Sequence, residues 1–305
     1  MSEYKKDFIK VKKKYLKFLK KQEVLGEPFQ DKMGQLKNYY IPICRSIFKS
    51  YIKNGRPVLI GLSGGQGSGK STMAQVLSLI INTKYKLHAI SFSIDDFYKK
   101  LSERKKMSKQ IHELFLTRGV PGTHDTNLLY RILKKLLKKN FKPLKIPRFD
   151  KSIDDRLPKN KWVKISKKPS VIIFEGWCVG AKHQSNKKLT KPINKLEKNS
   201  DKKLTWRKKV NNELIKNYKK IFNLIDKLIY LEIPSFKYVF KWRLLQEKKL
   251  KLSAKGKKVM TFLQIKNFIM FYERITKQMI KDLKFKADIT IKLDKKHRLS
   301  NIRIN

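Results

Sequence analysis

A glycine-rich segment, Gly64 to Ser71, has the residue types and the spacing of a phosphate cradle. It follows the apolar run 58–60 and leads into the helical pattern 72–77, so the expected order is strand, turn and helix. Glycines let backbone N–H groups curl around phosphate oxygens, and the helix directs the positive end of its dipole at them. We expect Lys70 to reach the β- and γ-phosphates of a nucleotide and the Ser71 hydroxyl to bind Mg²⁺. The alternative, a chance glycine-rich turn, is disfavoured by the flanking strand and helix. The predicted nucleotide-binding residues are Gly64, Gly65, Gln66, Gly67, Ser68, Gly69, Lys70, Ser71 and Thr72.

Three carboxylates stand where two other predicted strands end. Asp95 and Asp96 close the run 88–94, and Glu175 follows the branched residues 171–174. In a parallel sheet such ends meet at one edge, where a carboxylate can accept the proton of an attacking hydroxyl or hold Mg²⁺. The alternative is that these carboxylates only cap the turns that follow them. The predicted metal ligands are Ser71, Asp95 and Glu175.

Two loops combine charged side chains with turn residues. The first runs from Arg118 to Asp125 and the second from Pro147 to Arg156. Arginine forks suit a carboxylate and aspartate or histidine suits a hydroxyl, so together the loops indicate a small, hydroxylated and anionic acceptor. The alternatives are a tight turn with Asp125 as a helix cap and a solvated charged loop. The predicted acceptor-binding residues are Asp96, Tyr98, Arg118, His124, Asp125, Arg148, Asp150 and Arg156.

A later helical segment, 238–247, mixes cations with large aromatic side chains. Lys241 and Arg243 lie two residues apart, so they occupy different faces of a helix. One of them, for which we take Arg243, could close over a transferring phosphate as part of a lid. An ordinary amphipathic helix is the alternative. The predicted catalytic residues are therefore Asp95, Lys70, Glu175 and Arg243.

Strand and helix patterns alternate along the chain, which predicts an α/β fold with a mostly parallel sheet and helices on both faces. Residues 1–54 are expected to form a helical N-terminal extension, and residues 55–305 the catalytic domain. Within that domain the polar, lysine-rich segment 181–204 is expected to be a flexible loop, and a short tail follows the last strand. The expected strands are 58–62, 88–94, 171–174, 228–233 and 287–293. The expected helices are 4–22, 30–53, 70–81, 127–139, 206–225, 235–252 and 260–283.

The composition excludes several classes of protein. No apolar run approaches the ~20 residues of a membrane span, so no membrane association is expected. The first 20 residues lack the apolar core of a secretory signal. Two cysteines, Cys44 and Cys178, cannot build a disulfide framework, which fits a reducing cytoplasm. The sequence does not indicate an oligomeric state.

The formal net charge of +51 raises the question of a nucleic-acid partner. The excess is mostly lysine, it is spread over every segment, and no basic and aromatic recognition motif accompanies it. We therefore attribute it to a compositional bias and keep a nucleic-acid-binding ATPase as the less favoured hypothesis. The positive field would still draw in anionic metabolites and ATP.

Six strings, taken together, resemble the plant-type D-glycerate 3-kinase family, which belongs to the wider uridine kinase and phosphoribulokinase group of P-loop kinases. They run in family order over about residues 57–293. The matching strings are Gly64–Thr72, Ser93–Tyr98, Arg118–Asp125, Ile146–Ser152, Phe174–Trp177 and Tyr238–Glu247. The lysine-rich 181–204 segment departs from the family pattern and puts the edge of the acceptor pocket in doubt.

The resemblance implies a three-layer P-loop kinase fold and an enzyme that uses ATP and Mg²⁺. It implies transfer of the γ-phosphoryl group to D-glycerate, which gives 3-phosphoglycerate. Asp95 is similar in position to the general base of uridine kinases, with Asp96 the weaker candidate, and Glu175 to their Mg²⁺-linked glutamate. The implied acceptor pocket includes His124, Asp125, Asp150 and Arg156. A nucleoside, pantothenate or a sugar phosphate is the alternative acceptor on the same fold.

Overall fold

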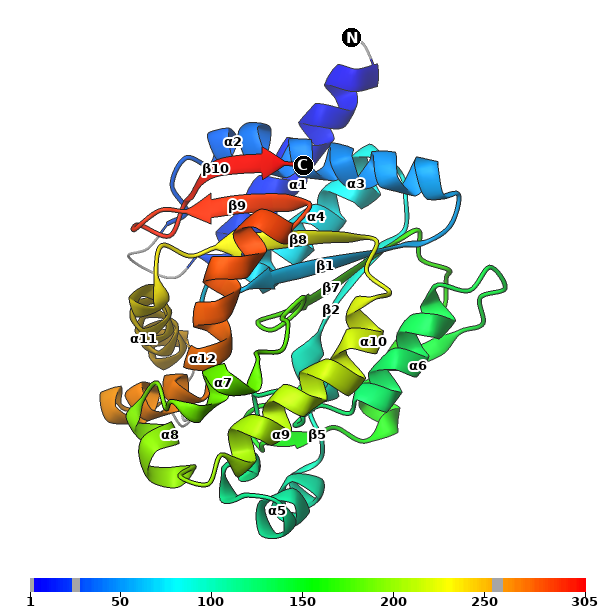
Figure 1. Cartoon of the computed structure of the whole chain (residues 1–305). Coiled ribbons are helices and arrows are strands. Elements are labelled where there is room, and N and C mark those ends of the chain that lie inside the picture. The colour runs from blue at the N-terminus through cyan, green and yellow to red at the C-terminus, as the bar shows by residue number, and fades with distance from the viewer. Residues whose placement is uncertain (1–2, 24–27, 254–259) are drawn as a thin grey trace.

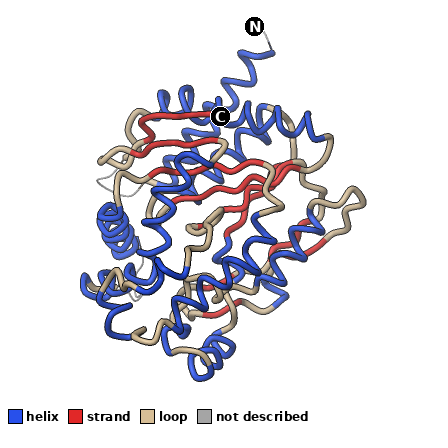
Figure 2. Tube along the Cα trace, viewed as in Figure 1, coloured by secondary structure: helices blue, strands red, loops and turns tan. Residues whose placement is uncertain are grey.

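A computed structural model describes residues 3–23, 28–253 and 260–305 of the chain. The main sheet contains β1 (Val58–Gly64), β2 (Ala89–Ser93), β7 (Val171–Gly176), β8 (Lys227–Glu232), β9 (Ile289–Leu293) and β10 (Leu299–Ile304). Their order in space is β10-β9-β8-β1-β7-β2. All neighbouring pairs in this sheet are parallel except β9 and β10. Figure 2 shows the strands as a twisted band with helices on either side, as the alternating pattern predicts.

Helices cover both faces of the sheet and produce three layers (Figure 1). One face is covered by α1 (Glu3–Gln22), α3 (Ile41–Asn54) and α4 (Lys70–Lys84). The other is covered by α6 (Thr126–Leu136), α9 (Thr205–Glu213), α10 (Lys219–Phe222) and α12 (Phe262–Lys286). Each face of the sheet has its own hydrophobic core. In β1, Val58 and Ile60 pack into the core beneath α1, α3 and α4, and Leu59 packs into the core on the opposite face. Burial on both faces explains why the strand reads as a continuous apolar run. The predicted α/β fold class is confirmed.

Residues 3–22 and 32–54 are helical and pack against the rest of the described chain. Short α2 (Lys32–Gln35) continues through a π-helical turn (Leu36–Tyr40) into α3, so the helix predicted at 30–53 is confirmed. Val11, Tyr15 and Leu19 of α1 share a core with residues of α4 and β1. The division of the chain at residue 54 stays a prediction.

Most other predicted elements are present within a few residues of the expected bounds. The helix predicted at 206–225 appears as α9, a π-helical turn (Leu214–Tyr218) and α10, and that predicted at 235–252 is α11 (Phe236–Ser253). Two predictions are wrong. The C-terminal tail forms β10 at the edge of the sheet. The expected loop at 181–204 contains α7 (Asn186–Thr190) and α8 (Lys195–Ser200), from which Leu189 and Glu197 are buried.

Several small elements between β2 and β7 have no counterpart in the expected pattern. A 3₁₀ turn (Ile94–Phe97) follows β2 directly, and α5 (Leu101–Gln110) comes after it. Two short hairpins pair β3 (Leu144–Ile146) with β6 (Val163–Ile165) and β4 (Phe149–Asp150) with β5 (Asp155–Arg156). The charged loop 147–156 is therefore mostly a hairpin, and this hairpin carries Lys151 at its turn.

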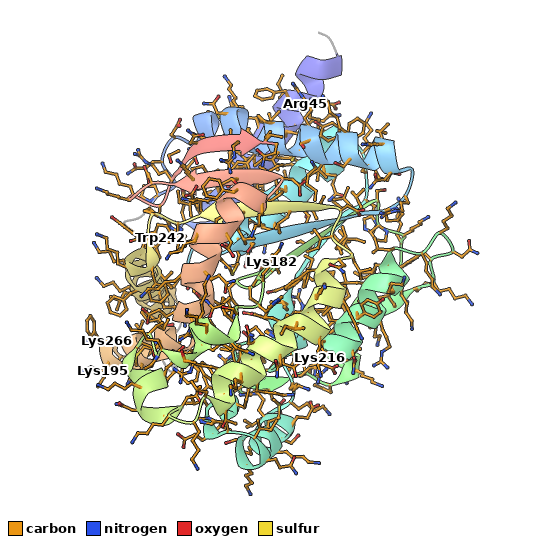
Figure 3. All side chains as sticks on the ribbon, in the orientation of Figure 1. Arg45, Lys182, Lys195, Lys216, Trp242 and Lys266 are labelled. Atoms are coloured by element: carbon orange, nitrogen blue, oxygen red, sulfur yellow. The ribbon has the colours of Figure 1, made fainter. Side chains whose placement is uncertain are left out.

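The basic side chains are distributed over the whole surface. Figure 3 shows nitrogen-tipped side chains projecting around the entire outline of the molecule. Among the labelled residues, Lys195, Lys216 and Lys266 are exposed and belong to three different helical segments. This distribution fits the expectation of a compositional bias. Among residues 3–23, 28–253 and 260–305, no helix is long and apolar enough to cross a membrane.

Candidate active site

The glycine-rich loop joins the end of β1 to the first residue of α4, as the motif predicts. Gly69 is the N-cap of α4 and has a φ of 87°, and Gly67 has a φ of 76°; both values favour glycine. A Cβ atom on Gly67 would lie 2.8 Å from the Cβ of Trp242 on α11, so no larger residue fits there. The loop and the first turn of α4 thus present backbone N–H groups and a helix N-terminus to the same space.

Polar atoms in this loop fit an anionic ligand. The side-chain amide N–H group of Gln66 and the hydroxyl of Ser68 are buried donors with no hydrogen-bond partner within the described chain. Buried donors normally have partners, and phosphate oxygens would supply them. The loop can therefore accept the polyphosphate of a nucleotide.

Lys70, Ser71 and Glu175 meet at the mouth of this loop. The Ser71 hydroxyl donates to Glu175 Oε1 at 2.8 Å, and Lys70 Nζ donates to the backbone oxygen of Gly65 at 3.0 Å. Glu175 reaches this point because β7 is the parallel neighbour of β1, with Leu62 opposite Glu175. Burial lowers the pKa of Lys70, although the nearby charge of Glu175 acts in the opposite direction. Burial raises the pKa of Glu175, and there the charge of Lys70 opposes the shift.

These residues also fit a magnesium ion. A hydroxyl and a carboxylate are oxygen ligands, and Mg²⁺ commonly takes one or two protein oxygens together with phosphate oxygens and water. The described part of the chain has no group of three or more His, Cys, Asp or Glu residues able to hold a metal. A magnesium ion held by Ser71 and Glu175 would take its other ligands from nucleotide phosphates and water.

Asp95 lies beside this cluster because β2 pairs with β7, with Ser93 opposite Glu175. Its carboxylate accepts a hydrogen bond from the Tyr98 hydroxyl at 2.9 Å and pairs with Lys151 Nζ at 2.8 Å. Burial alone would raise the pKa of Asp95, but the charge and the hydrogen bond of Lys151 hold that pKa well below its usual range. Asp95 is therefore an ionised hydrogen-bond acceptor.

The cluster lines a cavity of about 140 Å³ at the carboxyl ends of the strands, called here the catalytic cavity. Its charged residues are four cations and two carboxylates, so the net charge favours an anion. The cations are Lys70, Arg118, Lys151 and Arg243, and the carboxylates are Asp95 and Glu175. The remaining lining residues are Gln66, Gly67, Ser71, Tyr98, Gly176, Trp177, Gln246, Phe268 and Tyr272.

Two of the predicted acceptor residues, Tyr98 and Arg118, line the catalytic cavity. Arg118 forms an ion pair with Asp154, and its guanidinium lies 5.5 Å from the centre of the Phe149 ring. Arg243 also lines the cavity and pairs with Glu247 on the same helix. Its role as a lid residue stays a prediction.

Two aspartates predicted at the acceptor site have structural partners. Asp96 accepts weak hydrogen bonds from the backbone N–H groups of Ser93 and Phe149 and pairs with Arg148 at 3.3 Å. Burial raises the pKa of Asp96 despite Arg148. Asp150 accepts two hydrogen bonds from Ser152 in the turn of its hairpin. None of Asp96, Arg148 and Asp150 is among the described residues that line the catalytic cavity.

Asp125 and Arg156 pair with each other. Asp125 caps α6 by accepting from the backbone N–H of Leu128, and its other oxygen bonds Arg156 at 3.0 Å. The Arg156 side chain is buried and also pairs with Glu103. The helix-cap alternative for Asp125 therefore describes its observed contacts. Within the described chain, neither residue lines the catalytic cavity, and their role in binding stays a prediction.

His124 supports the cavity from behind Tyr98. The two rings stack with their centres 4.4 Å apart, and His124 Nδ1 lies 2.5 Å from the Tyr218 hydroxyl. Burial lowers the pKa of His124 to about 4, so the ring is neutral at pH 7. The stacking of His124 on Tyr98 orients the Tyr98 ring, whose hydroxyl donates a hydrogen bond to Asp95.

Six residues of the cavity lining were not among the predicted site residues. Lys151 lies inside the charged segment 147–156, so its charge is visible in the sequence. The sequence does not show that its side chain points into the cavity. Gly176 follows Glu175 directly in the sequence, and Trp177 comes next. The others carry no chemical signal because they occupy ordinary positions on amphipathic helices. The unassigned residues are Lys151, Gly176, Trp177, Gln246, Phe268 and Tyr272.

Comparison with known proteins supports this arrangement. Residues 59–184 match the phosphoribulokinase/uridine kinase family. An uncharacterized kinase of Schizosaccharomyces pombe, mug58, is 34% identical over 248 residues, which cover 79% of this chain and 87% of that protein. The chloroplastic D-glycerate 3-kinase of Arabidopsis thaliana is 30% identical over 257 residues, covering 78% of this chain and 53% of that protein. The chain thus spans about half the length of the plant enzyme.

A solved structure has the same fold. D-glycerate 3-kinase from Cryptococcus neoformans superposes with a TM-score of 0.74 at 24% sequence identity, covering 87% of this chain and 99% of that one. Together with the phosphate loop and the carboxylates beside it, these relatives identify a phosphotransferase that acts on a hydroxyl acceptor. The chain belongs to the phosphoribulokinase/uridine kinase family of P-loop kinases, in the group of relatives that includes plant D-glycerate 3-kinase.

Proposed function

We propose that this protein transfers the γ-phosphoryl group of ATP to the 3-hydroxyl of D-glycerate and produces 3-phosphoglycerate and ADP. The observation that carries the proposal is the catalytic cavity, which is small and cationic and brings Asp95 next to the phosphate loop. A volume of about 140 Å³ is well below the roughly 300–1,000 Å³ of pockets that take drug-sized ligands. A three-carbon acid fits this space better than a nucleoside or pantothenate does.

Arg118 is the proposed partner of the acceptor carboxylate. Its guanidinium lines the cavity, and arginine binds carboxylates through two parallel hydrogen bonds. The ion pair with Asp154 orients this side chain from the other direction. A carboxylate on Arg118 would place the far end of a three-carbon acid toward Asp95.

In the proposed reaction the acceptor hydroxyl oxygen bonds to the γ-phosphorus while the bond to the β–γ bridging oxygen breaks. The hydroxyl proton passes to Asp95, and ADP leaves with the bridging oxygen. The transition state of phosphoryl transfer is loose, so the proton moves late and a carboxylate of low pKa serves. Lys70 and Lys151 would neutralise the charge that develops on the transferring group. Mg²⁺ held by Ser71 and Glu175 would supply further neutralisation.

The test is the rate of ADP formation with different acceptors under identical conditions. We expect D-glycerate to raise the rate far above the rate without acceptor, and L-glycerate, uridine, a sugar phosphate and pantothenate to raise it much less. A preference for uridine or pantothenate would contradict D-glycerate as the acceptor but would leave the assignment as a kinase unchanged. ADP formation that RNA stimulates and D-glycerate does not would favour the nucleic-acid-dependent ATPase.

A further inference from the structure

Arg104 of α5 is a fully buried cation that the proposed reaction does not use. Its side chain has no exposed surface, although a buried charge is costly unless it is paired and hydrogen-bonded. Its guanidinium donates to the backbone oxygens of Lys99, Leu116 and Asp154, at 3.3, 2.6 and 2.6 Å. It also forms an ion pair with the Asp154 carboxylate at 3.0 Å. One buried side chain thus joins three segments of the chain.

Each of these three segments carries a residue of the catalytic cavity. Tyr98 directly precedes the first of the three anchored residues. Arg118 follows the second by two positions, and Lys151 lies in the same hairpin turn as the third. Tyr98 and Lys151 contact Asp95, and Arg118 is the proposed partner of the acceptor carboxylate. Arg104 therefore fixes the backbone on the side of the cavity where we place the acceptor.

Asp154 connects Arg104 to one of these cavity residues. One of its carboxylate oxygens pairs with Arg104, and the other accepts a hydrogen bond from Nη1 of Arg118. In the described chain the hydrogen bonds of the Arg118 side chain involve only Nη1, so its other N–H groups are available to a carboxylate. Two cations and one anion leave a net positive charge, which favours an anionic ligand.

We propose that Arg104 and Asp154 are positioning residues that orient the Arg118 guanidinium toward the acceptor carboxylate; this rests on the proposed function. A guanidinium binds a carboxylate through two parallel hydrogen bonds, so its plane must be fixed. A side chain that is already held in one orientation loses less conformational freedom on binding. The network therefore sets the preference for an acid over its uncharged analogues. Its effect falls on acceptor affinity, because the carboxylate lies away from the reacting hydroxyl.

Asp154→Asn tests the proposal with little disturbance of the backbone. Asp154 has a φ of 55°, a left-handed conformation that asparagine also tolerates, so the variant removes mainly the charge. We expect the KM for D-glycerate to rise roughly tenfold, the size of one hydrogen bond to a charged group. The kcat should change by less than about threefold, and the KM for ATP should not change. D-glyceramide, in which an uncharged amide replaces the carboxylate, should keep its wild-type kcat/KM.

A second variant and a matched control complete the experiment. In Arg104→Lys the charge remains, but one ammonium group cannot reach three backbone oxygens and a carboxylate as a guanidinium does. This variant should raise the same KM at least as much, and thermal unfolding shows whether it is folded. The control is Asp282→Asn, which should leave all these constants unchanged. The Asp282 side chain is 36% exposed, against 37% for Asp154, and it also pairs with a cation.

An unchanged KM for D-glycerate in Asp154→Asn would overturn the inference. A lower KM would also overturn it, because Asp154 would then compete with the acceptor for Arg118. Equal losses with D-glycerate and D-glyceramide would assign these residues a purely structural role instead. Failure of the proposed function looks different, because D-glycerate would then stimulate no turnover even by the wild type.

Discussion

Lys151 is the residue on which the state of Asp95 depends. Its ammonium group forms a 2.8 Å ion pair with that carboxylate. Burial raises the pKa of Asp95, and the charge and hydrogen bond of Lys151 outweigh this effect. The same ammonium group lines the space in which we place the transferring phosphoryl group. One side chain thus sets the charge of the proposed base and contributes to the stabilisation of transferred charge.

We therefore predict that Lys151→Met lowers kcat/KM for D-glycerate by roughly 100-fold, in the range of single general-base or charge-stabilising groups. The acid limb of the pH–rate profile should also move to higher pH, because the pKa of Asp95 rises when the cation is lost. Lys151→Arg should restore part of the rate and the original acid limb. The control is Lys161→Met, at an exposed turn residue, which should behave as wild type. An unshifted acid limb in Lys151→Met would refute this role.

His124 makes stability depend on pH. Its pKa is lowered by burial from 6.5 to about 4, so between these values the unfolded state binds a proton that the folded state does not. The contribution of His124 to the free energy of unfolding should therefore be fully present above pH 6.5. It should be lost as the pH drops toward 4, by about 3 kcal/mol in total.

Urea unfolding at pH 7.5, 5.5 and 4.5 measures this slope. His124→Gln should flatten it, because the group that titrates differently between the two states is gone. His183→Gln removes an exposed histidine and should keep the wild-type slope. The same slope in the His124→Gln variant would show that other groups set the acid sensitivity.

At the scale of elements, a buried charge network holds the 181–204 segment in place. Glu197 of α8 pairs with Arg207 of α9 at 3.1 Å and with Arg274 of α12 at 2.6 Å. Its oxygens also accept a hydrogen bond from the backbone N–H of Ile193. Burial opposes ionisation of Glu197, but the hydrogen bond and charge of Arg274, with the other partners, keep its pKa lowered.

Glu197→Gln should destabilise the protein by roughly 3–5 kcal/mol, because Arg274 loses its carboxylate partner and the buried Arg207 keeps only Asp201. Chemical denaturation gives the free energy of unfolding directly. Asp282→Asn, which removes an exposed partner of Lys286, is the control and should change stability by less than about 1 kcal/mol. Comparable small losses in both variants would mean that the network does not anchor these helices.

This segment also shows where sequence reasoning fails. Its lysines indicate a solvated loop, but they occupy the outer surface while Leu189, Glu197 and Asp201 turn inward. Whether a charged residue faces a partner or the solvent is decided by tertiary contacts that the local pattern does not encode. The same uncertainty explains why the ion pair between Asp125 and Arg156 was not predicted from the sequence.

Elements fixed by local chemistry were predictable. The phosphate loop needs glycines at set positions, and its position between a strand and a helix is legible in the sequence. The carboxylates after β2 and β7 were placed at one edge by the parallel-sheet rule, and Ser71 and Glu175 do meet there. In contrast, β10 is an edge strand with one partner, so its weak pattern resembled a tail.

For the molecule as a whole, the three-layer arrangement explains how distant parts of the chain form one site. Strands from residues 58 to 176 deliver the phosphate loop, Asp95 and Glu175 to the same edge, and the helices beyond residue 236 close over it. Residues of α1, of the segment 28–40 and of the segment 293–299 line a cavity of about 340 Å³ beside the phosphate loop. The high net charge is spread over this scaffold, while the catalytic cavity has its own local excess of cations.

In the proposed reaction Asp95 receives the proton of a small acid's hydroxyl as ATP phosphorylates it. The most direct measurement is the transfer of labelled γ-phosphate from ATP to D-glycerate by the wild type and by Asp95→Asn, with ADP binding determined for both. We predict labelled 3-phosphoglycerate from the wild type, a loss of at least about 100-fold in Asp95→Asn, and similar ADP affinities. Wild-type transfer by Asp95→Asn, or no label in 3-phosphoglycerate from the wild type, would contradict the account.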